Sequence, residues 1–419
     1  MKTRRQFLKS AASLAALSPF APMASLGAEQ ATVKKGKTLV VVFLRGGIDG
    51  LNFIVPHGDK DYYKHRERIA IARPGGAKGA VDLDGFFGLH PAADSLKPLF
   101  DSGTCRGLQA VGYAENSRSH FEEQDTWETG VMGDTVSADG WLNRHLNSSK
   151  GRGTIRAVSI GGNLPRILRG KAAAYSIRSV GDLAMPKLGG DQELIQAALR
   201  DAYCQTPGSN QEEARELMSK TAAATLEGAK QLEAVAKTKY EPKNGAKYAE
   251  NGIGNTFKEA ARLIRADIGT EVIEIDYGGW DTHNNQGGAD GGYANRLRDL
   301  TKAMAAFAKD LDGKMEDVMV LTLSDFGRTV RENGTSGTDH GWANCMVAMG
   351  GAAIGKSGSK PIHGEWPGLA PEQLYQNRDL KHTTDFRNVI GDAVSRHLGN
   401  PSVGLVLPNH QYQSTGLMG

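Results

Sequence analysis

The chain of 419 residues carries 50 basic and 47 acidic residues, a formal net charge of +3, and three cysteines. No basic stripe stands out from this balance, so the sequence gives no sign of a nucleic-acid-binding protein. Cys105, Cys204 and Cys345 are an odd number at wide spacings. This spacing excludes a disulfide framework and a C-x-x-C metal motif, while a single disulfide pair stays open.

The N-terminal segment has the three parts of a secretory signal. A basic head (residues 3–9, TRRQFLK) precedes an apolar stretch from Ala11 to about Ala21 and small residues up to Ala28. The apolar stretch is about half of the ~20 residues that span a bilayer, so we expect no stable membrane anchor. The pair Arg4 and Arg5 favours the twin-arginine route. We therefore predict a twin-arginine signal peptide over residues 1–28, the twin-arginine translocase as a partner, and a periplasmic or secreted protein.

Beyond the signal, short apolar runs alternate with helical patterns. The predicted strands are 38–44, 107–111, 155–160, 271–275, 318–323 and 345–349, and the clearest helices are 193–203, 211–236, 256–266, 293–311 and 384–398. Continuous apolar runs are typical of strands covered on both faces, and their alternation with helices favours a mostly parallel sheet. We predict one α/β domain over residues 29–419, with helices on both faces of the sheet. The Ala-, Glu- and Lys-rich stretch at about 188–250 is predicted to be a helical insertion.

Acidic and imidazole side chains lie in the loops at the ends of these strands. They are Asp49 after strand 38–44, Asp281 and His283 after strand 271–275, Asp325 after strand 318–323, and His340 just before strand 345–349. The carboxyl ends of parallel strands meet at one edge of a sheet, so the first four should converge there. His340 joins them if its strand runs antiparallel.

Three aspartates and two histidines suit a divalent cation with oxygen and imidazole ligands, such as zinc or manganese. A metal is also a physical reason to bring like charges together. The alternative for each residue alone is ordinary, because an aspartate after a strand often caps a helix or forms a turn. The joint pattern is what favours one or two metal ions as the cofactor.

Five segments also carry a resemblance to a known family. They are FLRGGIDGL (43–51), RSHF (118–121), GWDTH (279–283), LSDFGRT (323–329) and TDHG (338–341). The sequence resembles the exported bacterial family called domain of unknown function 1501, which groups with the alkaline phosphatase, sulfatase and phosphoglycerate mutase-like superfamily. The resemblance implies an alkaline-phosphatase-like core and a metal-dependent hydrolase of phosphate or sulfate esters. Its substrate would be a small-molecule or polymer-borne anionic ester.

The resemblance implies roles for individual residues. Asp49 resembles the first-strand metal ligand, Asp281, His283 and His340 resemble the ligands of one metal, and Asp325 resembles a ligand of another. Ser119, or alternatively Ser117, resembles the nucleophile at a helix start, where backbone N–H groups favour an anion. Arg45, Arg118 or Arg328 would clamp the oxygens of that anion.

The chain departs from the superfamily pattern in two places. Phe326 follows Asp325 where an Asp-His pair is usual, so the second metal site lacks an expected imidazole. Asp281 and His283 are also closer together than the usual spacing. A one-metal site, a changed reaction, or a non-catalytic exported binding or assembly protein that keeps the fold are therefore the alternatives. Either candidate serine could instead cap the helix that begins near Phe121.

Overall fold

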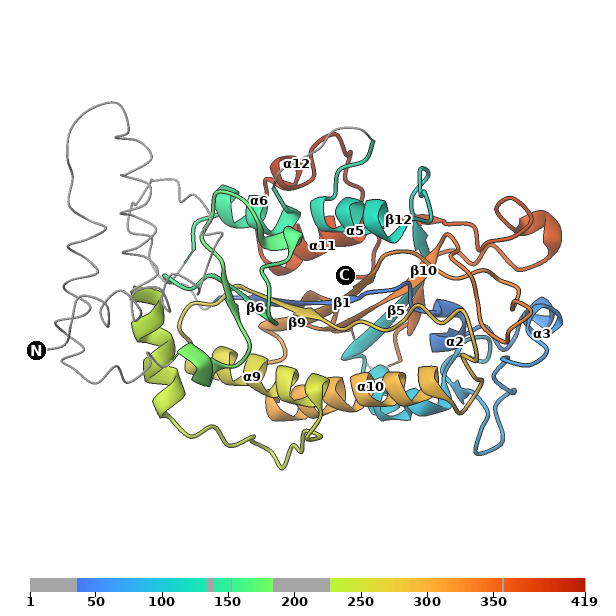
Figure 1. Cartoon of the computed structure of the whole chain (residues 1–419), viewed down its shortest axis with the longest axis horizontal. Helices are drawn as coiled ribbons and strands as arrows, with labels where there is room; N and C mark the ends of the chain where they lie inside the picture. The colour runs from blue at the N-terminus through green and yellow to red at the C-terminus, as the bar shows by residue number, and fades with distance from the viewer. Residues whose placement is uncertain (1–35, 134–138, 152, 184–226, 356–357, 419) are drawn as a thin grey trace, which may run out of the picture.

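The computed structural model describes residues 36–133, 139–151, 153–183, 227–355 and 358–418, and one large sheet runs through them (Figure 1). Its strands are β1 (Thr38–Leu44), β5 (Cys105–Gly112), β6 (Ala157–Ile160), β7 (Tyr175–Ile177), β8 (Val272–Asp276), β9 (Val318–Ser324), β10 (Asn344–Gly350), β11 (Ile362–His363) and β12 (Thr384–Asp385). The order is β11-β5-β10-β9-β1-β8-β6-β7, and β12 also pairs with β5. Of these described strands only β10 runs antiparallel to its neighbours, so the sheet is mostly parallel.

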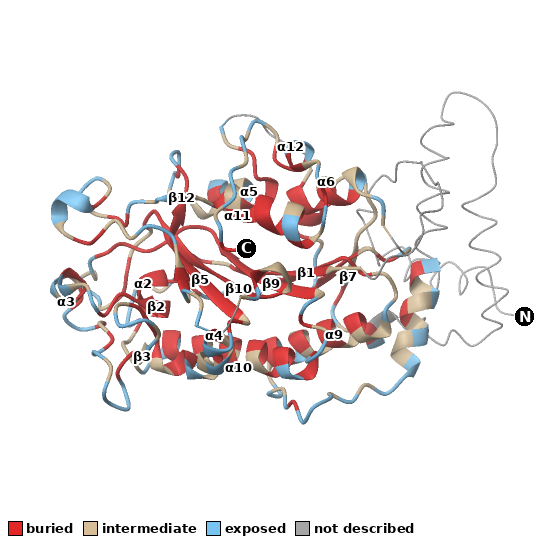
Figure 2. Ribbon diagram, turned by 180° about the vertical axis from the view of Figure 1, so that it is seen from behind, coloured by how far each residue is buried: buried red, intermediate tan, exposed pale blue. Residues whose placement is uncertain are grey.

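Helices cover both faces of the sheet (Figures 1 and 2). One face is covered by α9 (Gly252–Ala266), α10 (Gly292–Asp310) and the 3-10 helix η1 (Pro91–Leu96), and the other by α5 (His120–Thr129), α6 (Trp141–Ser148), α11 (Phe386–Asp392) and α12 (Val403–Val406). The central strand β1 shows why both layers form. Val40 and Val42 pack into the α9–α10 layer, whereas Val41 and Phe43 pack into the other layer, and all four are fully buried. A strand without a polar face must be covered twice.

Shorter elements surround this sandwich. They are α2 (Gly50–Phe53), α3 (Lys60–His65), α4 (Lys97–Asp101), the three-stranded sheet β2 (Ile54–Val55), β4 (Gly88–Leu89) and β3 (Val81–Asp82), the 3-10 turns η2 (Arg166–Leu168), η3 (Val180–Leu183), η4 (Gly351–Ala353) and η5 (Pro371–Gln373), and the π-helical turn η6 (Ala393–His397). Because α2 follows β1 directly, the small sheet and α3 lie at the carboxyl edge of the parallel strands.

The predicted fold class is confirmed. All six predicted strands are present, as β1, β5, β6, β8, β9 and β10, and the predicted helices 256–266 and 293–311 correspond to α9 and α10. The predicted helix 384–398 is shorter, because its first two residues pair with β5 as β12. The signal peptide and most of the insertion at about 188–250 lie outside the described residues and stay predictions, although residues 227–237 form a helix.

Two further findings concern membranes and thiols. Within the described ranges, no helix combines the length and the apolar character needed to cross a bilayer. Cys105 and Cys345 are both buried, and their thiols are free. Cys204 lies outside the described residues.

Candidate metal centre

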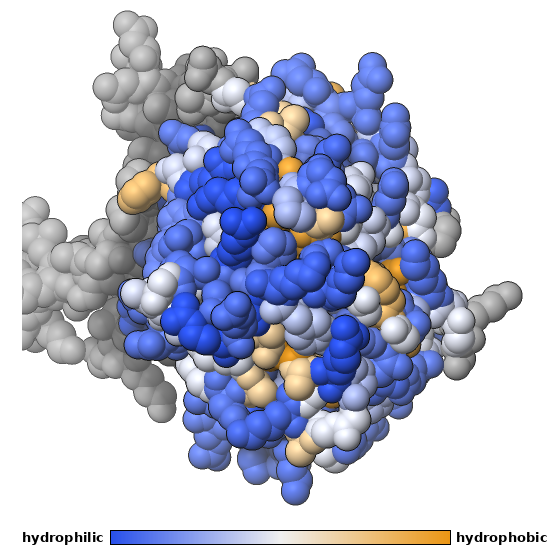
Figure 3. Space-filling model, turned by 90° about the vertical axis from the view of Figure 1, so that its right-hand side faces the viewer, coloured by the Kyte–Doolittle hydropathy of each residue, from blue (hydrophilic) through white to orange (hydrophobic). Residues whose placement is uncertain are grey.

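The loops that follow β1, β8 and β9 meet at the carboxyl edge of the sheet, and the loop before β10 joins them. The antiparallel pairing of β10 with β9 brings its leading end, and so His340, to this edge. The predicted condition for His340 is therefore met. Figure 3 faces the end of the molecule where α2 and α3 lie, and its surface is mostly hydrophilic with scattered apolar residues.

Three of the predicted ligands form a compact group. The Nε2 atoms of His283 and His340 lie 2.9 Å and 3.2 Å from Oδ1 of Asp281. The two Nε2 atoms are 3.0 Å from each other. One carboxylate oxygen and two imidazole nitrogens thus lie within 3.2 Å of one another. Asp281 is partly open to solvent, with 43% of its side chain exposed, so the group can be reached from outside.

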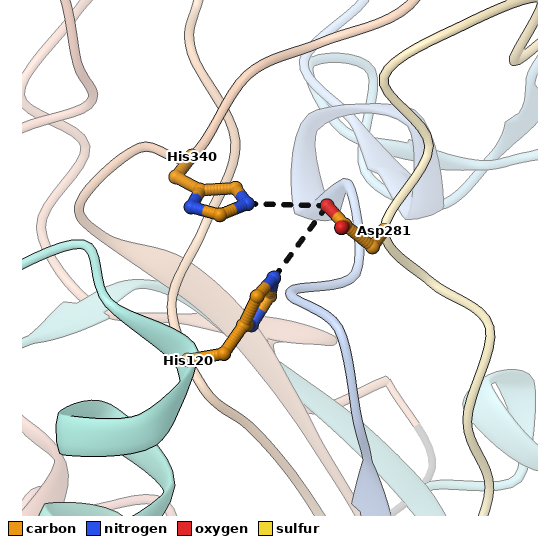
Figure 4. A group of neighbouring side chains, drawn as sticks. All are labelled: His120, Asp281 and His340. Carbon is orange, nitrogen blue, oxygen red and sulfur yellow. Dashed lines mark hydrogen bonds and ion pairs between the residues drawn. The ribbon is translucent and has the colours of Figure 1, made fainter.

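A third imidazole faces the same oxygen, and the sequence analysis did not assign it. Nε2 of His120 lies 3.5 Å from Oδ1 of Asp281, and its ring centroid is 4.3 Å from that of His340. Figure 4 shows His120 and His340 pointing toward Asp281 from the start of α5 and from the loop before β10. The ligand atoms of these three residues all lie within 4.8 Å of one another. The signal was present in the sequence, since His120 follows the candidate nucleophile beyond β5, whose carboxyl end lies at the same edge because β10 is antiparallel to both β5 and β9.

Each of the three histidines is held at Nδ1 by an oxygen acceptor. The pairs are His283 with Oδ1 of Asp339 at 2.8 Å, His340 with the carbonyl oxygen of Arg118 at 2.9 Å, and His120 with Oδ2 of Asp325 at 2.7 Å. A carbonyl or carboxylate oxygen only accepts, so Nδ1 carries the proton in each neutral ring. The Nε2 atoms therefore present lone pairs. Histidines that bind metals in proteins are held in this way.

The group therefore fits a divalent cation. The Nε2 atoms of His283, His340 and His120 each lie within 3.5 Å of Oδ1 of Asp281. The hydrogen bond to Asp325 raises the pKa of His120, so a cation at this point would compete with a proton for its Nε2. Burial lowers the pKa of His340, which favours its neutral form. Burial raises the pKa of Asp281, but the hydrogen bond and charge of Arg328 outweigh it and hold that pKa below the ordinary value. An anionic oxygen among imidazole nitrogens is a donor set typical of zinc.

Asp325 supports this group by holding His120. Its Oδ2 accepts from Gln124 at 2.9 Å as well as from His120, and its Oδ1 accepts from the backbone N–H of Gly46 at 3.0 Å. Burial raises the pKa of Asp325, but these hydrogen bonds outweigh the effect and lower it. The ring of Phe326 is fully buried, with centroids 4.7 Å and 4.8 Å from the rings of His120 and His340. Phe326 thus packs beside two of the imidazoles that face Asp281.

The structure does not bring Asp49 to this group, which corrects the predicted convergence. Asp49 is fully buried, and its Oδ2 contacts Nη1 of Arg66 and Nε2 of Gln286, each at 2.6 Å. Arg66 is also fully buried and donates to the carbonyl oxygens of Val330 and Thr329. The guanidinium neutralises Asp49 inside the core. Oδ2 of this carboxylate therefore has internal partners, whereas its buried Oδ1 has no hydrogen bond among the described residues.

Arg328 has a structural position instead of the predicted one at the ester. Its side chain is fully buried. It donates to the carbonyl oxygens of Gly46, Gly47, Trp280 and Thr338 and to Oδ1 of Asp281. Each of these bonds ties Arg328 to one of the loops that form the site. Together they occupy the guanidinium with protein acceptors. Gly46 has a φ of 115°, and a Cβ there would lie 2.6 Å from the backbone nitrogen of Asp281, so the two loops need a glycine to pack this closely.

The other two candidate arginines are also engaged by protein groups. Arg45 pairs with Glu128 and Asp276 and donates to Gln124. Arg118 pairs with Asp379, and donates to Gln376. All three guanidiniums, those of Arg45, Arg118 and Arg328, thus have protein partners in this structure, and their role at an ester stays a prediction.

The two candidate serines differ in what their hydroxyls contact. Ser117 donates from Oγ to Oε1 of Glu123 at 2.9 Å, and that same oxygen accepts its backbone N–H at 2.7 Å. Ser119 is the N-cap residue of α5 by position, but its side chain makes no capping hydrogen bond. Within the described residues no hydrogen bond involves the Ser119 hydroxyl. Ser119 is therefore the serine whose oxygen stays available.

The structure thus defines a mostly parallel α/β protein with a histidine-rich candidate metal centre at the carboxyl edge of its sheet. The chain belongs to the family described as "Protein of unknown function (DUF1501)", which it matches over residues 106–402. No curated protein gave a significant sequence match.

Several solved structures are similar to the chain at low identity. The PsFucS1 sulfatase from Pseudoalteromonas sp. is 14% identical, with a TM-score of 0.37, and the match covers 88% of this chain and 68% of that one. The zinc complex of the C-terminal periplasmic domain of EcEptC from Escherichia coli is 11% identical, with a TM-score of 0.36 and coverages of 94% and 91%. The alkaline phosphatase from the Antarctic bacterium TAB5 is 11% identical, with a TM-score of 0.28 and coverages of 75% and 92%. Because these TM-scores are low, the fold class rests on the sheet topology described above.

Proposed function

We propose that the protein is an exported, metal-dependent hydrolase of phosphate or sulfate esters that uses one metal ion. One observation carries this proposal. The Nε2 atoms of His283 and His340 lie 3.0 Å apart beside Oδ1 of Asp281, while both Nδ1 atoms are held by acceptors. Two neutral rings held in this way direct lone pairs at each other, which is unfavourable unless a proton or a metal ion lies between them.

Asp281, His283 and His340 would hold the ion in this site. A bound divalent ion supplies positive charge to an ester oxygen and lowers the pKa of a nearby hydroxyl. Asp339 fixes the ring of His283, so its Nε2 keeps its direction without the ion. The imidazole nitrogens favour zinc over manganese, which prefers carboxylate, carbonyl and water oxygens.

Ser119 is the proposed nucleophile. Its hydroxyl is unengaged, and it precedes the first residue of a ten-residue helix, where backbone N–H groups favour an anionic ester. Ser117 is less suited, because Glu123 already accepts its hydroxyl proton.

A single ion is favoured over two because Asp49 is already neutralised. Its partner Arg66 is buried with it, and the Asp325 carboxylate is committed to His120 and Gln124. Because the three candidate arginines are already paired with protein groups, we expect weak activity on simple esters. A polymer-borne ester fits a site whose candidate arginines are already paired better than a small ester does, because the rest of the polymer can add contacts with the protein.

The alternative is an exported binding protein that keeps the fold and the metal but has no catalytic activity. The pairing of all three candidate arginines favours this alternative, since a hydrolase of anionic esters usually stabilises charge that develops at the reacting centre. The two functions differ in one measurable respect. Only the hydrolase loses activity when the Ser119 hydroxyl is removed while metal stays bound.

The test combines metal analysis with an ester assay on the folded, purified protein. We expect about one zinc per chain, loss of that zinc in the double variant Asp281→Ala/His283→Ala, and slow zinc-dependent hydrolysis of 4-nitrophenyl phosphate or 4-nitrophenyl sulfate. Ser119→Ala should keep the zinc and lose the hydrolysis. A protein that binds zinc but hydrolyses neither ester, on its own or as a polymer-borne sulfate, would support the binding function.

The export step has its own test. Replacing Arg4 and Arg5 with lysines should keep the precursor in the cytoplasm, because the twin-arginine pathway recognises the guanidinium pair. Undiminished export of that variant would contradict the proposed route.

A further inference from the structure

His120 has a ring nitrogen without a hydrogen bond among the described residues. Its Nε2 is buried and makes no hydrogen bond within the described residues, although Nδ1 is held by Asp325 at 2.7 Å. A buried polar atom without a partner is unfavourable. The same nitrogen lies 3.5 Å from Oδ1 of Asp281, the oxygen that His283 and His340 also face. The unsatisfied atom is therefore directed at the candidate metal centre.

The loop that leads to His120 is held in an uncommon backbone conformation. Arg118 has a φ of 59°, in the left-handed region that non-glycine residues rarely adopt. Its backbone N–H donates to Oδ1 of Asn116 at 2.7 Å, and Glu123 binds both the N–H and the hydroxyl of Ser117. Several contacts thus over-determine a strained turn, and strain of this kind concentrates at functional sites.

This turn places two groups against the metal centre at once. The carbonyl oxygen of Arg118 accepts from Nδ1 of His340 at 2.9 Å, and two residues later the His120 ring reaches Asp281. Ser119 lies between these two groups. The residues directly before and after Ser119 in the sequence therefore both contact the candidate metal centre.

We propose that His120 is a ligand of the same metal ion, so that the site is mononuclear with three imidazoles and one carboxylate. This inference rests on the proposed metal site and adds a ligand that the resemblance did not supply. Three nitrogens and one oxygen match the four-coordinate preference of zinc, with bonds of about 2.0–2.2 Å. The alternative is that His120 only positions Asp325. That carboxylate already accepts from Gln124 and Gly46, so it does not need His120 for this purpose.

A consequence for Ser119 follows from this ligand set. Protein contacts already hold the first turn of α5, and a bond from His120 to the ion would tie this preformed turn to the zinc. The chain would then need no second ion to place Ser119 beside the metal site.

The experiment measures zinc and cobalt binding, without relying on activity. In wild-type protein, zinc X-ray absorption should show three imidazole ligands. In His120→Ala and His120→Gln, the Kd for zinc, from competition with a chromophoric chelator, should rise by more than about 100-fold, since loss of a second-shell partner alone costs about 10–100-fold. The visible absorption of the cobalt-substituted variants should also change. Asp325→Asn, which replaces the carboxylate acceptor of Nδ1 with a neutral amide, should weaken zinc binding by about 10–100-fold.

The matched control is His410→Ala, which removes a half-buried histidine whose ring has one hydrogen-bond partner among the described residues, Asn388. It should leave the Kd for zinc and the cobalt spectrum unchanged. Two imidazoles by X-ray absorption, or unaltered zinc and cobalt binding in the His120 variants, would overturn this inference and leave the proposed function standing. Failure of the wild-type protein to bind zinc would overturn the proposed function itself.

Discussion

Asp49 and Asp281 occupy equivalent places, because each lies in the loop after a central parallel strand, yet their surroundings are opposite. Asp49 is fully buried and pairs with the buried guanidinium of Arg66 at 2.6 Å. Asp281 keeps 43% of its side chain exposed and faces three imidazole nitrogens. One carboxylate is neutralised by the protein, and the other is placed where an external cation fits.

The difference shows that an aspartate at a strand end is not by itself a metal ligand. A buried guanidinium provides the positive charge that a second ion would otherwise provide, and it stays in place because both partners are hydrogen-bonded. The guanidinium next to Asp281 is that of Arg328. It donates to four carbonyl oxygens as well as to Asp281, whereas Arg66 beside Asp49 donates to two. The contrast can be tested from both sides.

The largest expected effect concerns the Asp49 side. Arg66→Met leaves Asp49 as an unpaired buried charge and should lower the free energy of unfolding by about 3–5 kcal/mol, measured by chemical denaturation. The double variant Arg66→Met/Asp49→Leu should cost less than the single one, because neither charge remains. Zinc content should stay at one per chain in the double variant. Equal destabilisation in both variants would mean that packing, and not charge pairing, sets the role of Arg66.

A second expectation concerns the pH dependence of stability that arises from His90, which interacts electrostatically with Asp49. Burial lowers the pKa of His90 to about 4, and its Nδ1 accepts from the N–H of Ala92 at 3.0 Å. Between the unfolded pKa of about 6.5 and the folded value, the unfolded chain binds a proton that the folded one refuses. The contribution of neutral His90 to the free energy of unfolding should therefore be fully present above pH 6.5. It should fall by up to about 3 kcal/mol as the pH drops to about 4.

The control for this pH effect is His90→Asn, which keeps an N-cap acceptor and does not titrate. Its stability should decline less steeply than that of the wild type between pH 7 and pH 4.5. Parallel curves for the two proteins would show that His90 does not contribute to the acid sensitivity.

A smaller effect is expected where the two regions touch. Gln286 is buried, donates to Asp49, and accepts from the hydroxyls of Thr282 and Thr338, which lie beside the candidate ligands. Gln286→Met removes these bonds and should lower the free energy of unfolding by about 1–3 kcal/mol. The Kd for zinc should rise by less than about tenfold, because no ligand is lost. A larger rise would show that the Asp49 side controls the metal side.

The smallest expected effect on stability is that of Ser119→Ala. Loss of a capping serine usually costs about 1 kcal/mol, but here the hydroxyl makes no capping bond. We expect a change within about 0.5 kcal/mol and unchanged zinc content. A loss of about 1 kcal/mol or more would assign the hydroxyl to capping, which is the alternative that the sequence left open.

The sheet could be predicted from the sequence because its central strands are continuous apolar runs. Burial on both faces leaves no polar alternation in β1 or β9, and such runs are typical of covered parallel strands. His340 was predictable on one condition, the reversed direction of β10, because that reversal alone puts the start of a strand at the carboxyl edge. The predicted helix at 384–398 began too early, since Thr384 and Asp385 satisfy β5 instead.

The rest of the site depends on contacts that no local pattern contains. Arg66 follows α3 and meets Asp49 only because the chain folds back over 17 positions. His120 meets Asp325 across 205 positions, so its direction follows from tertiary packing and not from its place at a helix start. The arginines could be recognised as candidates by type, but their partners, which decide whether they are free, are distant in sequence.

The buried guanidinium of Arg328 has a thermodynamic consequence. Its bonds to Gly46, Gly47, Trp280, Thr338 and Asp281 join the loops after β1 and β8 and the loop before β10 while the chain folds. The conformational entropy of ordering these loops is therefore lost at folding and not at ion binding. Calorimetry should accordingly find little ordering penalty when the ion enters, and limited proteolysis should cut the ion-free and ion-bound forms at similar rates.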